Sequence, residues 1–298
     1  MRSIIEITAL TKDYHKQRGI FDMNLTIKQG EIVGIVGQNG AGKTTTMRML
    51  MGFIKPTSGH STINNLNTWQ QSAKTKKFIG YVPGEIAFPD TKSGTTFLQT
   101  QLELLHAAKD DYVNELIQRF KIDLTADIKR MSKGMKQKTA LVCAFMTKPP
   151  LLLLDEPTTG LDPVMRETFI ELVLKVKANG TTVFLSSHMF NELERTCDRI
   201  LFLKNGQIID TLNQERIAAL HHYQRVTIQT TDSNSAQQLL QSNFEVTRFD
   251  ANQRIVTLVI AENQTQLFLE LLQHIHIKDI DFATQTLDNY FEKELARN

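Results

Sequence analysis

The stretch Gly37-Gln38-Asn39-Gly40-Ala41-Gly42-Lys43-Thr44 matches the phosphate-loop pattern GxxxxGK[ST] at every fixed position. Glycines let the backbone wrap a polyphosphate without a Cβ in the way, so that many N–H groups can donate to it at close range. In this pattern Lys43 brings a positive charge near the β and γ phosphates, and the Thr44 hydroxyl is available to Mg²⁺. The stretch therefore predicts a binding site for a nucleoside triphosphate.

The residues on either side of the loop fit this interpretation. Residues 31–36 form an apolar run typical of a buried strand, and residues 45–51 predict a helix whose positive dipole end points at the phosphates. Thr45, at the start of that helix, is counted among the nucleotide-binding residues. The alternative is a glycine-rich turn that merely connects strand and helix, and it is less favoured because the motif has the context that its mechanism needs.

The composition is that of an ordinary globular protein, with 298 residues, 41% hydrophobic and 22% charged. The apolar runs are far shorter than the roughly 18 residues that cross a bilayer, and the start of the chain lacks a stretch of signal-peptide length. We therefore expect a cytoplasmic chain that does not span a membrane itself. A net charge of +2 does not argue for nucleic-acid binding, and Cys143 and Cys197 are expected to be buried thiols without metal.

Strands and helices are expected to alternate through the first 220 residues. Residues 1–30 contain two alternating runs that predict antiparallel strands, while Leu151–Leu154 and residues 181–185 predict central parallel strands. Helical spacing over residues 90–122 predicts a helical insertion. The expected fold class is α/β, a mostly parallel sheet with added antiparallel strands, a helical subdomain over about residues 86–148, and ligands at the carboxyl ends of the strands.

The pattern changes past about residue 222. Short strands and helices follow in the order βαββαβ, which matches a small ferredoxin-like unit. We therefore predict two domains, a nucleotide-binding domain over residues 1–220 and an α+β accessory domain over residues 221–298.

Two adjacent acids, Asp155 and Glu156, directly follow the apolar run that ends at Leu154. A carboxylate at the end of a central strand beside a phosphate loop is suited to hold Mg²⁺, so Asp155 and Thr44 are the predicted metal ligands. Glu156 points differently and can polarise a water for in-line attack on the γ-phosphate as a general base. The alternative is that both acids only terminate the strand before Pro157.

His188 follows the strand predicted over residues 181–185. A single histidine at a strand end is usually structural, but the strand order brings this one to the same phosphate. We therefore predict that His188 contacts the γ-phosphate or the attacking water, and that Glu156 and His188 are the catalytic residues.

Together these motifs resemble the ATP-binding subunit of an ATP-binding-cassette (ABC) transporter, over about residues 3–215. The resemblance implies the P-loop cassette fold, with ATP and Mg²⁺ as ligands and ATP hydrolysis as the activity. It implies that Tyr14 stacks on adenine, that His188 is the switch histidine, and that Gly160-Leu161-Asp162 is the loop coupling two subunits, so that Asp162 belongs to the nucleotide site.

The family signature Leu-Ser-Gly-Gly-Gln is altered here to Met131-Ser132-Lys133-Gly134-Met135. Ser132 and Gly134 are retained, and the resemblance implies that they contact the γ-phosphate of a nucleotide held by a partner subunit. It therefore implies an ATP-dependent head-to-tail dimer. Five basic residues between Lys129 and Lys138 are interpreted as a solvated helix face rather than a nucleic-acid site.

A second departure lies in the loop after Ile79-Gly80-Tyr81-Val82-Pro83, where Gly84 and Glu85 replace the glutamine that is usual in the family. Whether Glu85 takes over the role of this amide stays open. The departures, with the ending over residues 286–291, resemble the bacterial export systems whose cassette has a C-terminal extension. The resemblance implies a separate integral-membrane permease, a position at the inner face of the cell membrane and an unidentified exported substrate.

Two other functions are weighed against this one. A cassette ATPase acting on ribosomes or DNA is less favoured, because one phosphate loop and no basic linker, coiled coil or zinc site are evident. A nucleotide-binding module without hydrolysis is suggested by the altered signature and the missing glutamine.

Overall fold

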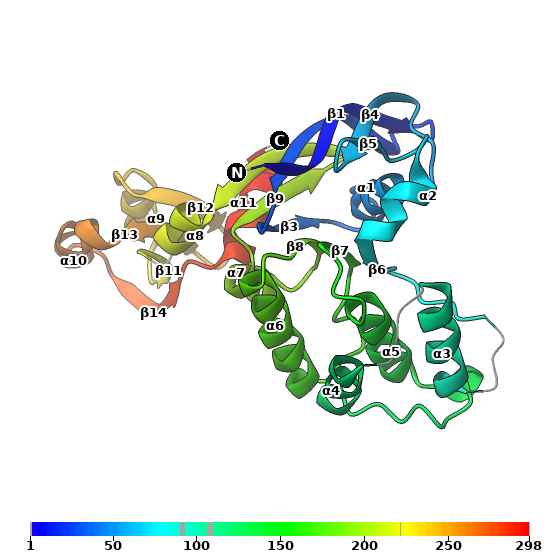
Figure 1. The fold of residues 1–298 in the computed structure, drawn as a ribbon. Coiled ribbons are helices and arrows are strands. Elements are labelled where there is room, and N and C mark those ends of the chain that lie inside the picture. The colour runs from blue at the N-terminus through cyan, green and yellow to red at the C-terminus, as the bar shows by residue number, and fades with distance from the viewer. Residues whose placement is uncertain (1, 90–92, 106–109, 221, 298) are drawn as a thin grey trace. The chain divides into compact units, whose positions relative to one another are not determined.

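The computed structural model describes residues 2–89, 93–105, 110–220 and 222–297 (Figure 1). The chain divides into two compact units, Met1–Thr211 and Leu212–Asn298. The expected boundary at residue 220 lies further along the chain than this division, because α8 (Gln214–Leu220) falls in the second unit. There Leu212 and Leu220 line a cavity together with Tyr223 and Val259.

A six-stranded sheet forms the centre of the first unit, in the order β10-β9-β3-β8-β7-β6. Its strands are β3 (Ile32–Gly37), β6 (Ile79–Val82), β7 (Leu151–Asp155), β8 (Thr182–Ser186), β9 (Arg199–Lys204) and β10 (Gln207–Asn213). The pairs β3/β8, β3/β9, β6/β7 and β7/β8 are parallel, and every residue of β3, β7 and β8 is buried. Parallel strands end at one edge, so the loops after β3, β7 and β8 leave the sheet together.

A second sheet, in the order β2-β1-β4-β5, is antiparallel. Its strands are β1 (Ser3–Asp13), β2 (Gly19–Lys28), β4 (Ser58–Ile63) and β5 (Leu66–Asn67). Helix α1 (Lys43–Leu50) contacts β2 and β4 of this sheet and β3 and β7 of the parallel sheet (Figure 1). One buried apolar cluster joins both sheets through Met47 and Leu50.

Helices make up much of the described chain between β6 and β7, as the spacing predicts, while residues 90–92 and 106–109 of the predicted insertion lie outside the described residues. They are α3 (Gly94–Leu104), α4 (Asp111–Arg119) and α5 (Lys133–Phe145), and both α3 and α4 contact α5. Ser93, Asp110 and Ser132 are N-caps whose side chains accept a backbone N–H, which explains where each helix begins. A short helix, α2 (Ser72–Thr75), precedes β6, while α6 (Pro163–Ala178) follows β7 and α7 (Phe190–Thr196) follows β8.

The second unit has the predicted βαββαβ order. Its strands and helices are β11 (Tyr223–Thr230), α9 (Ser233–Leu240), β12 (Glu245–Asp250), β13 (Ile255–Ala261), α10 (Thr265–Leu272) and β14 (Ile277–Thr284), followed by α11 (Leu287–Arg297). The antiparallel sheet has the order β12-β13-β11-β14. Its apolar cluster includes Val226, Leu239, Leu258 and Phe268.

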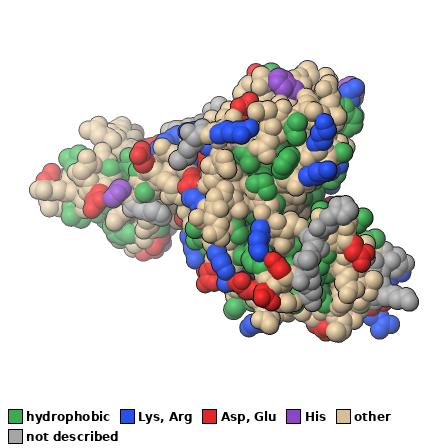
Figure 2. Space-filling view, in the orientation of Figure 1, with side chains coloured by type: hydrophobic (Ala, Val, Ile, Leu, Met, Phe, Trp, Pro, Cys, Tyr) green, Lys and Arg blue, Asp and Glu red, His purple; other side chains and the backbone are tan. Residues whose placement is uncertain are grey.

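Within the described residues, none of the helices combines the length and the apolar character that crossing a membrane requires. Figure 2 shows basic and acidic side chains both present on the visible face, in line with the net charge of +2.

Leu153 in β7 tests the importance of this core. We expect Leu153→Ala to lower the free energy of unfolding by about 2–5 kcal/mol, because the side chain is fully buried and its removal leaves a cavity. Urea unfolding followed by circular dichroism measures the change. The control Leu174→Ala, whose side chain is 41% exposed, should stay within about 0.5 kcal/mol. Equal losses of unfolding free energy in the two variants would contradict the burial of Leu153 in the core.

Candidate functional site

The phosphate loop connects the end of β3 to the start of α1. Gly40 and Gly42 have φ angles of +85° and +115°, which L side chains rarely adopt. A Cβ at position 42 would also lie only 2.3 Å from Ile20 Cδ1. Helix α1 has no capping side chain at Gly42, so its first N–H groups are left for an anion in the loop.

Lys43 lies across the mouth of this loop. Its Nζ donates to Gly37 O at 2.6 Å and lies 4.0 Å from Glu156 Oε1. Burial lowers the pKa of Lys43, while the negative charges of Glu156 and Asp155 act in the opposite direction. The ammonium group is thus held by a carbonyl and carboxylates in a position where phosphate oxygens could replace them.

A cavity of about 220 Å³ lies over the loop. It is lined by Gln38, Asn39, Gly40, Ala41, Gly42, Lys43, Thr44, Thr45 and Glu156. The structure therefore brings the predicted loop residues and the predicted general base around one space.

Asp155 is the fully buried last residue of β7. Its Oδ1 accepts a hydrogen bond from Ser186 Oγ at 2.6 Å, whereas its buried Oδ2 has no partner among the residues that the structure describes. The loop after β6 also passes close to this oxygen, since a Cβ at Gly84 would lie 2.9 Å from it. A buried carboxylate oxygen without a donor is costly unless a cation binds it, and carboxylate and hydroxyl oxygens suit Mg²⁺, so the residues fit the ion.

Glu156 has a left-handed backbone with φ +50°, which is strained for a residue with a side chain. Its N–H donates to Ser186 Oγ at 3.0 Å, and its Oε2 lies 2.6 Å from His188 Nδ1. The His188 side chain is 62% exposed at the carboxyl edge of the sheet. Glu156 therefore contacts both Lys43 and His188.

The residues expected to face a second subunit lie apart from these contacts. Ser132 and Asp162 are the N-caps of α5 and α6, where their side chains accept from Met135 N and Met165 N. Gly134 packs against Gly160, since a Cβ there would lie 2.8 Å from Gly160 O.

Tyr14 lies in the loop between β1 and β2, 46% exposed, with Lys12 Nζ 5.2 Å from its ring centroid. No hydrogen bond or ring contact joins Tyr14 to the described phosphate loop. Its proposed contact with adenine rests on the resemblance.

Sequence reasoning missed two buried side chains that hold the acids. Ser186 binds both Asp155 and Glu156, and Gln137 Nε2 donates to Pro157 O at 2.7 Å. The only local signal for Ser186 is that it ends the strand before His188. For Gln137 the sequence has no signal, because its partner comes from another element.

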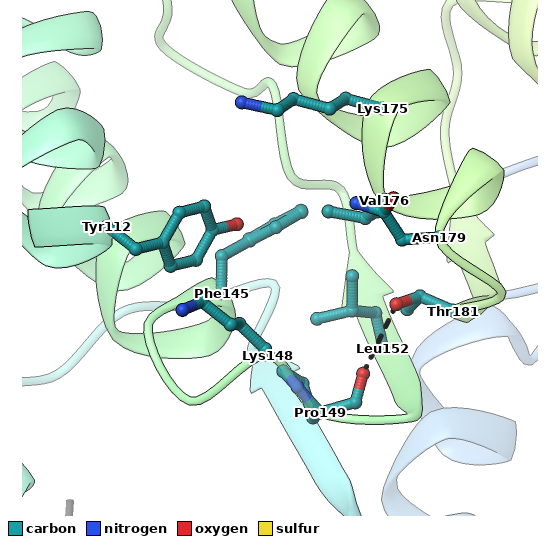
Figure 3. Close-up of a pocket in the computed structure, with 9 residues that line it drawn as sticks. All are labelled: Tyr112, Phe145, Lys148, Pro149, Leu152, Lys175, Val176, Asn179 and Thr181. Atoms are coloured by element: carbon teal, nitrogen blue, oxygen red, sulfur yellow. Dashed lines mark hydrogen bonds between the residues drawn. The ribbon is translucent and has the colours of Figure 1, made fainter. Parts of the chain in front are cut away.

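A larger cavity of about 380 Å³ lies at the amino end of β7, away from the phosphate loop (Figure 3). Phe145, Leu152 and Val176 contribute apolar surface to it, and Tyr112 and Lys148 stand at one side. Lys148 is paired with Asp110 at 2.9 Å, and its Nζ also lies 4.7 Å from the ring centroid of Tyr112. This cavity contains none of the predicted site residues.

Comparisons with known proteins identify the family of this chain. A family model described as ABC transporter matches residues 20–159. The bacitracin transport ATP-binding protein BcrA of Bacillus licheniformis is 30% identical over 98% of this chain and 97% of its own length. A solved ATP-binding subunit of an ABC transporter is 29% identical, with a TM-score of 0.67, and covers 72% of this chain and 91% of its own.

A dimeric ATP-binding cassette bound to ADP and Pi shares the fold, with a TM-score of 0.64 and 24% identity over 71% of this chain and 99% of its own. The phosphate loop at the edge of a parallel sheet, with a buried aspartate beside it, defines a P-loop nucleotide-binding protein. The chain belongs to the ATP-binding subunits of ABC transporters. The expected family and cassette fold are confirmed.

Lys43→Ala is expected to weaken ATP binding by about 10- to 100-fold, the scale of one charge-assisted contact to phosphate. Titration with a fluorescent ATP analogue measures the affinity. Lys148→Ala is the matched control, because this lysine lines the other cavity and should leave the affinity unchanged. Equal ATP affinities of the two variants would contradict the assignment of the nucleotide site to the loop at residues 37–44.

Proposed function

We propose that this chain hydrolyses ATP and so drives export of a substrate through a separate membrane permease. The observation that carries the proposal is the contact of Glu156 Oε2 with His188 Nδ1 at 2.6 Å, beside the cavity over the phosphate loop. A general base must be oriented and must face the phosphate end of the site, and these contacts meet both needs.

Each side chain has one task in this proposal. The loop N–H groups and Lys43 bind the phosphates, which spreads the negative charge of the γ-phosphate over several donors. Glu156 accepts a proton from the attacking water, and the His188 contact fixes the direction of its carboxylate. The left-handed backbone of Glu156 aims the side chain back toward Lys43, 4.0 Å away.

Asp155 and Thr44 would hold Mg²⁺. When bound, the ion would neutralise part of the negative charge of the phosphates. The support is the buried Oδ2 of Asp155, which has no donor within the described part of the chain.

A second copy would complete the site in a head-to-tail dimer. Ser132 begins α5, so its hydroxyl stands at the positive end of that helix dipole, which favours contact with a phosphate, while Asp162 begins α6 in the loop proposed to couple the two copies. The close packing of Gly134 on Gly160 keeps these two segments together. We further propose that Tyr14 stacks on the adenine.

The permease would hold the chain at the inner face of the membrane. The proposed contacts are the helical insertion and the loop at Gly84 and Glu85, which reaches from β6 to α3 and passes against Asp155. A movement of Gly84 would therefore change the surroundings of Asp155, the proposed Mg²⁺ ligand.

Glu156→Gln tests the catalytic role. We expect ATP turnover to fall by more than about tenfold, because the amide cannot accept the proton, while ATP binding is kept and an ATP-bound dimer accumulates. Phosphate release and gel filtration with ATP and Mg²⁺ are the measurements. Glu171→Gln, on the exposed face of α6 with 71% of its side chain accessible, is the control with normal turnover. Normal turnover in Glu156→Gln would exclude this residue as the base.

For the substrate, we propose a peptide antibiotic of the bacitracin type. The support is that two relatives matching nearly the whole chain, from Bacillus licheniformis and Enterococcus faecalis, are named for bacitracin transport. Producing the chain with its encoded permease in a sensitive host should raise the inhibitory concentration of bacitracin several-fold, and the Glu156→Gln form should not. Unchanged sensitivity with both proteins present would exclude this substrate.

A further inference from the structure

Glu192 in α7 is a buried acid without a role in the proposed function. It is only 4% exposed, and its Oε1 has no hydrogen-bond partner among the described residues. Burial raises its pKa, and hydrogen bonds from Thr158 and Ser187 oppose that shift. An acid is expensive to bury, so its position calls for a physical reason.

One oxygen of Glu192 connects two loops. Its Oε2 accepts from Thr158 Oγ1 at 2.8 Å and from Ser187 Oγ at 3.2 Å. Ser187 Oγ in turn accepts from Met189 N at 2.9 Å, at the start of α7. The carboxyl group thus ties the loop after β7 to the loop after β8 and to the helix that follows.

These two loops carry the proposed catalytic pair. Thr158 lies two residues after Glu156, and Ser187 lies directly before His188. Three consecutive residues at the end of β8 are therefore each linked to the end of β7 or to the loop after it. Ser186 binds Asp155 and His188 contacts Glu156 directly. Ser187 is linked to Thr158 through Glu192. Only the Ser187 connection needs a third residue.

We propose that Glu192 is a positioning residue that holds the Thr158 and Ser187 loops together and so sets the Glu156–His188 contact. The inference rests on the proposed hydrolysis of ATP. The acceptor oxygen is the required feature, because both partners are hydroxyl donors and the second oxygen binds neither of them. Glutamine keeps one such oxygen and should therefore preserve the function of Glu192, whereas alanine should not.

The test compares Glu192→Ala with Glu192→Gln in the full chain, using ATP and Mg²⁺. Glu192→Ala should lower kcat about 10- to 100-fold with an unchanged KM, since it displaces the catalytic pair and leaves the phosphate loop intact. Glu192→Gln should keep kcat within about twofold. A rise in KM alone, or equal losses in both variants, would overturn the inference.

A double-variant cycle with His188→Ala checks the route of the effect. If Glu192 acts through this pair, the double variant loses much less than the product of the two single losses. A loss of kcat in the double variant equal to the product of the two single losses would overturn the inference. The Glu156→Gln variant separates the two proposals. Normal ATP turnover in Glu156→Gln would contradict the proposed function. A large loss of turnover in Glu156→Gln together with normal turnover in Glu192→Ala would contradict the positioning role alone.

Thr158→Val provides a second test if Glu192→Ala does not fold. It removes one hydroxyl donor with little change in shape and should lower kcat several-fold at an unchanged KM. The protein should keep its ATP affinity, while its thermal unfolding midpoint should fall by several degrees because one buried hydrogen bond is lost. A normal kcat in a folded Thr158→Val protein would overturn the inference.

Discussion

The parallel pairing of β3, β8 and β7 is the constraint on which the rest of the site depends. Ser186 lies level with Ile35 on one side and with Asp155 on the other. Asp155 belongs to this line of three residues, and the phosphate loop, Glu156 and His188 follow it, so they leave the sheet at the same edge. All three strands are buried along their whole length, as is typical of central parallel strands covered on both faces.

Hydroxyl groups then determine how the acids are presented. Ser186 donates to one oxygen of Asp155 and accepts from the Glu156 N–H, which supports the strained backbone of Glu156, while none of the described residues donates to the other Asp155 oxygen. Buried polar groups of this kind are stable only when almost all of them are paired. The second Asp155 oxygen, which lies beside the phosphate loop, is therefore suited to a cation.

The site also has a link to the segment proposed to face a second copy. Gln137, one turn into α5 after Ser132, donates to the carbonyl of Pro157, directly after Glu156. Gly134 packs on Gly160 in the same region. The start of α5 is therefore joined by direct contacts to the backbone beside the proposed base.

The sequence by itself predicted the chemistry of the site. The pattern at residues 37–44 and the acids after the apolar run are local, and so is the strand and helix order of both units. It did not reveal Ser186, Gln137 or Glu192, and its predicted boundary at residue 220 differs from the division of the structure after Thr211. Only the tertiary structure decided that His188 meets Glu156, 32 residues away. The physical reason is that such contacts depend on the pairing of β7 with β8, whereas a sequence pattern describes only neighbours along the chain.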